Sequence, residues 1–265
     1  MRQCKWQIAG TGLLLFWCQV VAADEAPLLR DDFSLDRGRY EFHGEHAWRY
    51  DTGTLRVAAE RSDSFAVTNL PRIEQGRIEA DVCVRRRLSG GYVTAGLTLF
   101  SDAENHWCLL LVASPEDRPY FELIERLHGI HQAQTGAVTP TTRLAAQHDG
   151  ELDCWEYGRT YRLAFSISQE SITGEIRDAE TGRFWRTTFS FAAGLALRRG
   201  RPGLASCGMD AAFDDLVVYG RLPTAAAAPV PPRGPAGSVT IIPGEVSPLA
   251  DQLKSLFEDA GFGAA

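Results

Sequence analysis

Two short runs, one near the start of the chain and one far along it, predict the first and last strands of a single antiparallel domain. The first is Arg30-Asp31-Asp32-Phe33-Ser34, and the second extends from Ala212 to Tyr219. In the second run Phe213, Leu216 and Val218 are expected to reach one face of a sheet, with two aspartates at its rim. We therefore expect the second run to be an edge strand that seals a β-sandwich.

The sequence between these runs alternates apolar and polar residues and is punctuated by turn signals, which is typical of all-β sandwiches. In residues 78–85, the apolar side chains from Ile78 to Val84 fall on one side of a strand and Glu79, Asp81, Cys83 and Arg85 on the other. This period of two excludes an amphipathic helix. Further strands are expected at 92–100, 107–113, 120–126, 161–168, 172–178, 184–191, 203–207 and 213–219. Residues 128–158 show little pattern, and loops of that length are usually functional or disordered.

The first 23 residues have the pattern of a signal peptide. Arg2 and Lys5 give a basic start, residues 8–21 are mostly apolar, and Val21-Ala22-Ala23 is a small-residue cleavage site. The apolar stretch contains glycines and is shorter than the roughly 20 residues that a spanning helix needs. We expect an exported protein, periplasmic or extracellular, with no membrane span after removal of the signal.

The rest of the chain divides into three parts. Residues 24–221 are expected to form the sandwich, and 222–246 are a linker rich in proline and alanine. Residues 247–261 predict a short amphipathic helix, with Leu249, Leu253 and Phe257 on one face. Such a helix either docks on the sandwich, binds a protein partner, or is a frayed tail.

Charge and cysteine content narrow the range of functions. The net charge is −7 and no basic stripe is present, so nucleic acid is not expected as a partner. Four cysteines follow the signal: Cys83, Cys108, Cys154 and Cys207. In an exported protein they allow up to two disulfides, of undetermined pairing, and we expect at least one; buried thiols are the alternative. Zinc is not expected, because no Cys-x-x-Cys pair occurs.

The order of several short motifs resembles a known family. They are Asp31-Asp32-Phe33, residues 76–82, Ala95-Gly96-Leu97, Asn105-His106-Trp107, Tyr161-Arg162-Leu163, Pro202-Gly203-Leu204 and Phe213-Asp214-Asp215. Residues 29–221 are thereby similar to the concanavalin A-like, laminin G-like domains of bacterial exported proteins. The resemblance implies an antiparallel two-sheet jelly-roll β-sandwich. It also implies a domain of a kind that often binds glycans and is sometimes catalytic.

An acidic motif suggests a catalytic alternative. Glu151, Asp153 and Glu156 have a spacing similar to the Glu-x-Asp-x-x-Glu motif of laminarinase-type glycoside hydrolases, which share this jelly roll. The resemblance implies a nucleophile at Glu151, its modulator at Asp153 and an acid/base at Glu156. Here, however, Gly158 and the next strand follow almost at once. The other interpretation is an acidic loop before that strand, anchored by its aromatic residues.

Two further sets of residues are candidates for binding. Asp31, Asp32, Asp214 and Asp215 come from terminal strands expected to be neighbours, and carboxylates are ligands for Ca²⁺. Neighbouring aspartates on a strand point to opposite faces, so at most one of each pair would hold a structural calcium ion; otherwise all four are rim carboxylates.

Aromatic residues predict a carbohydrate surface, because sugar rings stack on aromatic faces. Six were considered, of which one or two are expected to be exposed: Trp48, Tyr92, Trp107, Tyr120, Trp155 and Trp185. His106 and Trp107 are predicted on the concave face as ligand-binding residues. The function expected first is a carbohydrate-binding module or accessory of a polysaccharide-active system. The alternatives are a glycoside hydrolase and a structural or adhesive module of the envelope.

Overall fold

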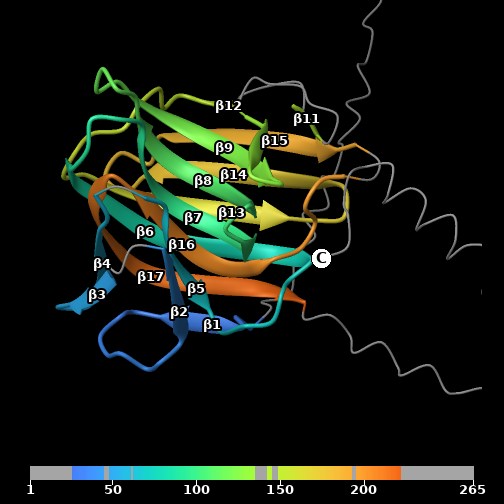
Figure 1. Cartoon of the computed structure of the whole chain (residues 1–265), viewed down its shortest axis with the longest axis horizontal. Helices are drawn as coiled ribbons and strands as arrows, with labels where there is room; N and C mark the ends of the chain where they lie inside the picture. The colour runs from blue at the N-terminus through green and yellow to red at the C-terminus, as the bar shows by residue number, and fades with distance from the viewer. Residues whose placement is uncertain are drawn as a thin grey trace, which may run out of the picture. The chain divides into compact units, whose positions relative to one another are not determined.

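The structure, a computed structural model, is a sandwich of two antiparallel β-sheets (Figure 1). It describes residues 26–44, 48–60, 62–134, 142–144, 149–192 and 195–221. The predicted all-β, two-sheet fold is confirmed. The predicted signal peptide at 1–23, the linker at 222–246 and the helix at 247–261 lie outside the described residues. Among the residues that the structure describes, no helix is long and apolar enough to cross a membrane.

The larger sheet has ten strands, all paired antiparallel. In spatial order its main path is β11 (Thr142–Leu144), β15 (Phe184–Phe191), β14 (Ser171–Asp178), β13 (Thr160–Ile167), β6 (Gln75–Arg87), β17 (Met209–Arg221), β4 (Thr54–Ala58) and β3 (Trp48–Asp51). Two short strands complete it: β1 (Leu29–Asp31) beside β17 and β12 (Asp149–Gly150) beside β15.

The smaller sheet has seven strands and lies over the larger one in Figure 1. Its order is β10 (Ile130–Ala133), β9 (Pro119–Leu127), β8 (Asn105–Ala113), β7 (Val93–Asp102), β16 (Arg201–Cys207), β5 (Ser64–Thr68) and β2 (Tyr40–Gly44). Strands β7 and β8 form the hairpin that the sequence predicts.

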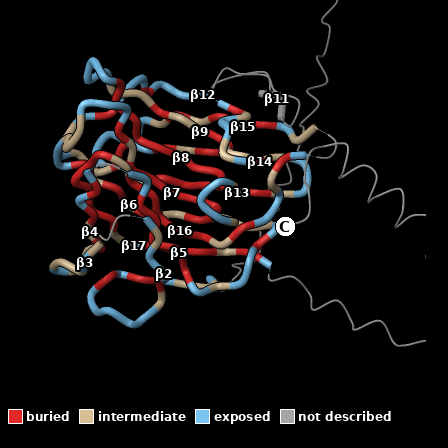
Figure 2. Tube along the Cα trace, in the orientation of Figure 1, coloured by how far each residue is buried: buried red, intermediate tan, exposed pale blue. Residues whose placement is uncertain are grey.

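The core lies between the two sheets, and the alternation predicted in β6 is confirmed. Ile78, Ala80, Val82 and Val84 are at most 1% exposed and belong to this core. The side chains between them point to the outer face of the larger sheet. Figure 2 shows buried segments concentrated along the central strands of both sheets.

The prediction of an edge strand at 213–219 is wrong, because β17 has partners on both sides. It pairs with β6 on one side, and on the other with β4 through residues 210–213 and with β1 through residues 216–218. The register shifts between Asp214 and Val217, and Asp215 adopts a φ of 46°. This bulge lets both Phe213 and Leu216 reach the core, where each is 0% exposed.

Four strands near the start of the domain, β2 to β5, were not predicted from the sequence. Strand β5 is buried at all five positions, so it carries no alternation of apolar and polar residues. Strands β3 and β4 are joined at Thr52 and Gly53, whose φ values of 46° and 76° mark a tight hairpin turn.

The predicted disulfide is not found: no disulfide joins Cys83, Cys108, Cys154 and Cys207. Cys108 is buried, whereas Cys154 is exposed on the segment before β13. Burial raises the pKa of the Cys108 thiol to about 12. The alternative considered from the sequence, that buried thiols occur in this domain, holds for Cys108.

Substitution of Trp107 on β8 tests how much core packing contributes to stability. Its ring is fully buried against Phe189 and Phe191, and its Nε1 donates to the carbonyl oxygen of Leu197 at 2.9 Å. Because Trp107→Ala leaves a cavity, we expect urea unfolding to show a free energy of unfolding lowered by about 3–5 kcal/mol. The exposed aromatic Tyr92 is the control, and Tyr92→Ala should change this free energy by less than about 0.5 kcal/mol. Equal unfolding curves for the two variants would contradict this packing.

The different exposure of the cysteine thiols leads to a second prediction. In the native, unreduced protein we expect Cys154 to be alkylated by iodoacetamide first and Cys108 only after unfolding, because a buried thiol of raised pKa is neither accessible nor ionised. Peptide mass spectrometry measures both rates, and Cys154→Ser should remove the fast phase. Cysteines that become reactive only after reduction would reveal a disulfide and contradict the structure.

Candidate functional site

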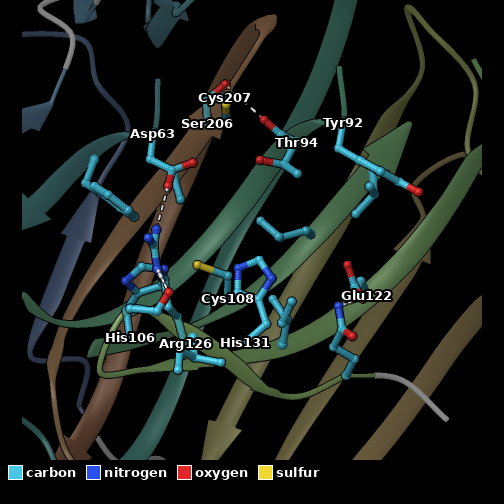
Figure 3. Close-up of a pocket in the computed structure, with 18 of the residues that line it drawn as sticks. Asp63, Tyr92, Thr94, His106, Cys108, Glu122, Arg126, His131, Ser206 and Cys207 are labelled. Atoms are coloured by element: carbon cyan, nitrogen blue, oxygen red, sulfur yellow. Dashed lines mark hydrogen bonds and ion pairs between the residues drawn. The ribbon is translucent and has the colours of Figure 1, made fainter. Parts of the chain in front are cut away.

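The outer face of the smaller sheet holds a cavity of about 750 Å³ (Figure 3). Its floor is apolar and comes from four strands, β5, β8, β9 and β16. The floor residues are Phe65, Cys108, Leu110, Val112, Ile124 and Ala205. They belong to a second apolar cluster, separate from the core between the sheets. The seven-stranded sheet is therefore apolar on both faces.

Strand β8 divides its side chains between the core and this cavity. His106, Cys108, Leu110 and Val112 line the cavity, whereas Trp107, Leu109 and Leu111 belong to the core. His106 thus lines the cavity, and its predicted role in ligand binding stays a prediction. The same prediction for Trp107 is wrong, because residues next to each other on a strand point to opposite faces.

His106 packs mainly against aromatic side chains of the outer face. Its ring lies 5.1 Å from that of Phe65 and is stacked on Phe100 at 6.3 Å. Burial lowers the pKa of His106, so the ring is neutral near pH 7. Its Nδ1 lies 3.3 Å from the carbonyl oxygen of Asp102.

The rim carries two exposed apolar side chains. Tyr92, on the turn before β7, is 63% exposed, and Ile130, at the start of β10, is 62% exposed. Tyr120 is half-buried on the outer face of β9 and also lines the cavity. Of the six aromatic residues named from the sequence, Tyr92 and Tyr120 line the cavity, and of these two Tyr92 is exposed.

The β9–β10 hairpin is held over one end of the cavity by backbone and ionic contacts. The Arg126 guanidinium lies 3.1 Å from the Asp63 carboxylate, and its Nε donates to the Gly129 carbonyl oxygen at 3.2 Å. The backbone amide of Gly129 in turn donates to the Glu104 carbonyl oxygen at 3.0 Å. Figure 3 shows the Asp63–Arg126 pair on one side of the cavity.

Glu122 also lines the cavity, on the side away from the Asp63–Arg126 pair (Figure 3). It is half-buried on β9, and Gln134 Nε2 donates to its carboxyl oxygen at 3.3 Å. Burial raises the pKa of Glu122 to about 7. At neutral pH the cavity therefore holds a carboxyl group divided between its acid and its ionised form.

Several of these residues were not singled out from the sequence: Asp63, Glu122, Arg126, Ile130 and His131. A signal existed for two of them, because Glu122 and Arg126 alternate along β9 with the core residues Phe121 and Leu123. The others depend on how the β4–β5 and β9–β10 turns fold onto the sheet, which alternation does not reveal.

The acidic motif lies elsewhere. Glu151, Asp153 and Glu156 are exposed on an irregular segment between β12 and β13, and none of them lines this cavity. On that segment Trp155 is 1% exposed, and its Nε1 donates to the Val112 carbonyl oxygen at 2.8 Å. The motif is thus the acidic loop with an aromatic anchor that was the second interpretation.

The structure brings together only part of the aspartate set. Asp31 is buried and turned inward, and it accepts hydrogen bonds from the Phe33 amide and the Tyr40 hydroxyl. Burial raises the pKa of Asp214, and the nearby charges of Asp215 and Asp32 raise it further. Within the described residues, however, no group of three or more His, Cys, Asp or Glu side chains is arranged to hold a metal ion.

The outer face of the larger sheet contrasts with that of the smaller one. Its charged side chains pair with each other across neighbouring strands: the Arg162 guanidinium lies 3.0 Å from Glu79 and 3.3 Å from Asp81. Arg186 pairs in the same way with Glu175. Such a face is solvated and satisfied, and it offers no apolar floor to a ligand.

Comparisons with known proteins identify the fold. No family model matches the chain, and no curated protein sequence matches it. Among solved structures it is similar to the GH43 protein BlXynB (mutant K247S) of Bacillus licheniformis, with a TM-score of 0.51 and 12% identity over 72% of this chain and 39% of that one. It is also similar to the carbohydrate-binding module CBM66 of Bacillus subtilis, with a TM-score of 0.49 and 12% identity over 68% of this chain and 96% of that one.

Lectin II of Ulex europaeus is a third similar structure, with a TM-score of 0.49 and 12% identity over 74% of this chain and 100% of that one. The chain spans less than half of the GH43 protein but almost the whole of the other two. The two-sheet antiparallel β-sandwich inferred from sequence motifs is present in the structure, and the likeness to the GH43 protein agrees with it. At such identity a likeness speaks for fold alone.

The raised pKa of Glu122 predicts how stability depends on pH. Between the ordinary value of 4.5 and about 7, the folded protein keeps a proton on Glu122 that the unfolded chain has released. The contribution of this group is therefore fully present below pH 4.5 and is lost as pH rises through 7. We expect Glu122→Gln to unfold at higher urea concentration than the wild type at pH 8 and to show a smaller loss between pH 5 and pH 8. Parallel pH profiles for the two proteins would contradict the burial of this carboxyl.

Proposed function

We propose that this protein is an exported glycan-binding module and that it binds sugar in the cavity on the outer face of the seven-stranded sheet. The observation that carries the proposal is the combination of an apolar floor with two exposed apolar side chains, Tyr92 and Ile130, at the rim. Exposed apolar groups gathered around a concave site mark a binding surface.

The chemistry of the cavity suits a pyranose ring. Such a ring has apolar faces, which pack on an aromatic or aliphatic surface, and a rim of hydroxyl groups, which need hydrogen-bond partners. Tyr92 and the aliphatic floor supply the surface. Asp63, His131 and Gln134 stand at the rim as partners for hydroxyls. The cavity volume of about 750 Å³ is that of a small-molecule site, enough for a short oligosaccharide.

The residues of the cavity favour sugar binding without hydrolysis. Retaining glycosidases need two carboxyl groups about 5 Å apart at the scissile bond. Glu151 and Glu156 are outside the cavity, and within it the Asp63 carboxylate is already paired with Arg126. The hydrolase alternative that uses Glu151 and Glu156 therefore has no observation in its favour among the described residues.

Export and calcium remain predictions within this proposal. The signal-peptide pattern at residues 1–23 predicts a module outside the cytoplasm. A structural calcium ion at Asp32 and Asp214 agrees with the mutual proximity of their charges, and Asp31 takes no part in it because its carboxylate faces the interior. Ca²⁺ has no role in the sugar contacts proposed for the cavity.

Tyr92→Ala tests the proposal directly. We expect retention of the wild type on at least one immobilised polysaccharide of a broad panel, and roughly tenfold weaker binding of the variant, because one stacking platform contributes about 0.5–1.5 kcal/mol beyond its buried area. Leu35→Ala is the matched control, since Leu35 is also 63% exposed but does not line the cavity. Glu151→Gln and Glu156→Gln should bind like the wild type.

The same panel distinguishes the outcomes. Unchanged binding of the Tyr92 variant would move the site away from the cavity. Release of reducing ends that is abolished by either glutamine variant, with the fold intact, would replace binding by hydrolysis as the function.

A further inference from the structure

Among the described residues, the cavity lining carries one ion pair, Asp63 with Arg126, and one further carboxyl group, Glu122. Among the described residues that line it, Arg126 is the single permanently cationic side chain, and it is paired with Asp63 at 3.1 Å. The Arg126 Nε is also used, by the Gly129 carbonyl oxygen. Among the described residues of the lining, no permanently cationic side chain is therefore unpaired and able to bind an acidic ligand.

Glu122 differs from this pair, because no cationic side chain of the described residues is paired with its carboxyl group. On its own strand it is flanked by Tyr120 and Ile124, and across the ladder it stands opposite Leu110 of β8. Cys108 on β8 and Gln134 after β10 are the other groups near it. Within the described residues its one hydrogen bond is the neutral contact from Gln134.

This arrangement discriminates between ligands by charge. A uronate or sulfate group placed near Glu122 would be taken out of water beside a like charge, with no free cation to offset the cost. A protonated amine would instead make a charge-assisted hydrogen bond, which is about twice as strong as a neutral one. The ammonium group of the ligand would then offset the free-energy cost of burying the ionised Glu122 carboxyl.

We propose that the cavity is selective for glycans that carry a free amino group, and that the Glu122 carboxylate binds the ammonium of an amino sugar. The inference rests on the proposed function and names the substrate class of the same site. Tyr92, which also lines the cavity, packs on a sugar ring of the same oligosaccharide. The balanced Asp63–Arg126 pair at the other side accepts neutral hydroxyl groups.

The test compares oligosaccharides that carry an amine, a neutral acetamide or a carboxylate. Calorimetric titration of the full chain compares a glucosamine oligomer with its fully N-acetylated counterpart of equal length, with an oligogalacturonate as the acidic probe. We expect the glucosamine oligomer to bind about tenfold more tightly than the acetylated one, as a hydrogen bond to a charged group predicts, and the galacturonate to bind most weakly. Glu122→Gln should reduce the first difference to less than twofold, whereas the exposed carboxyl variant Glu151→Gln should retain it.

A second readout separates a direct contact from a structural effect. Binding of an ammonium group favours the ionised carboxyl, so an NMR titration should show the pKa of Glu122 falling when the glucosamine oligomer is bound. Equal or weaker binding of the glucosamine oligomer, relative to the acetylated one, would overturn the selectivity but leave glycan binding in place. Absence of binding to all three oligomers and to the polysaccharide panel would overturn the proposed function and this inference together.

Discussion

Strand β8 has apolar side chains on both of its faces, and both faces must be shielded from water. The inward side chains, among them Trp107, pack against the ten-stranded sheet and form the core. The outward ones, from Cys108 to Val112, cannot be covered by that sheet. The β9–β10 hairpin and the side chains at the rim shield them in part, and the remaining space is the cavity. A sugar ring in that space would complete the burial.

The two outer faces of the sandwich therefore have different physical properties. On the larger sheet, Arg162 and its carboxylate neighbours satisfy one another, and replacing water there would bring little gain. On the smaller sheet, apolar surface is already removed from water at the floor and is still exposed at Tyr92. Glu122 is half-buried on that face with a neutral hydrogen-bond donor, Gln134, and burial raises its pKa. Affinity and selectivity are thus expected from the same face.

The sequence predicts most of the fold because many strands have one apolar and one polar face. Strand β6 is the clearest example: Ile78 and Val82 face the core, and the charged residues between them face outward. The same argument fails for β8, where both faces are apolar, and so Trp107 was placed on the wrong side of the sheet. It fails also for β5, which is buried throughout, and for β17, whose edge position depended on partners that alternation does not reveal. The cysteines could not be paired from sequence because their distances depend on the whole topology.

The central claim is that ligand binds on the outer face of the seven-stranded sheet. The most direct measurement is an amide NMR titration of the isotopically labelled protein with an oligosaccharide that it retains. The account predicts that the perturbed amides belong to β8, β9 and the turn that carries Tyr92. Perturbations confined to residues 151–158, or to the outer face of the ten-stranded sheet, would contradict it.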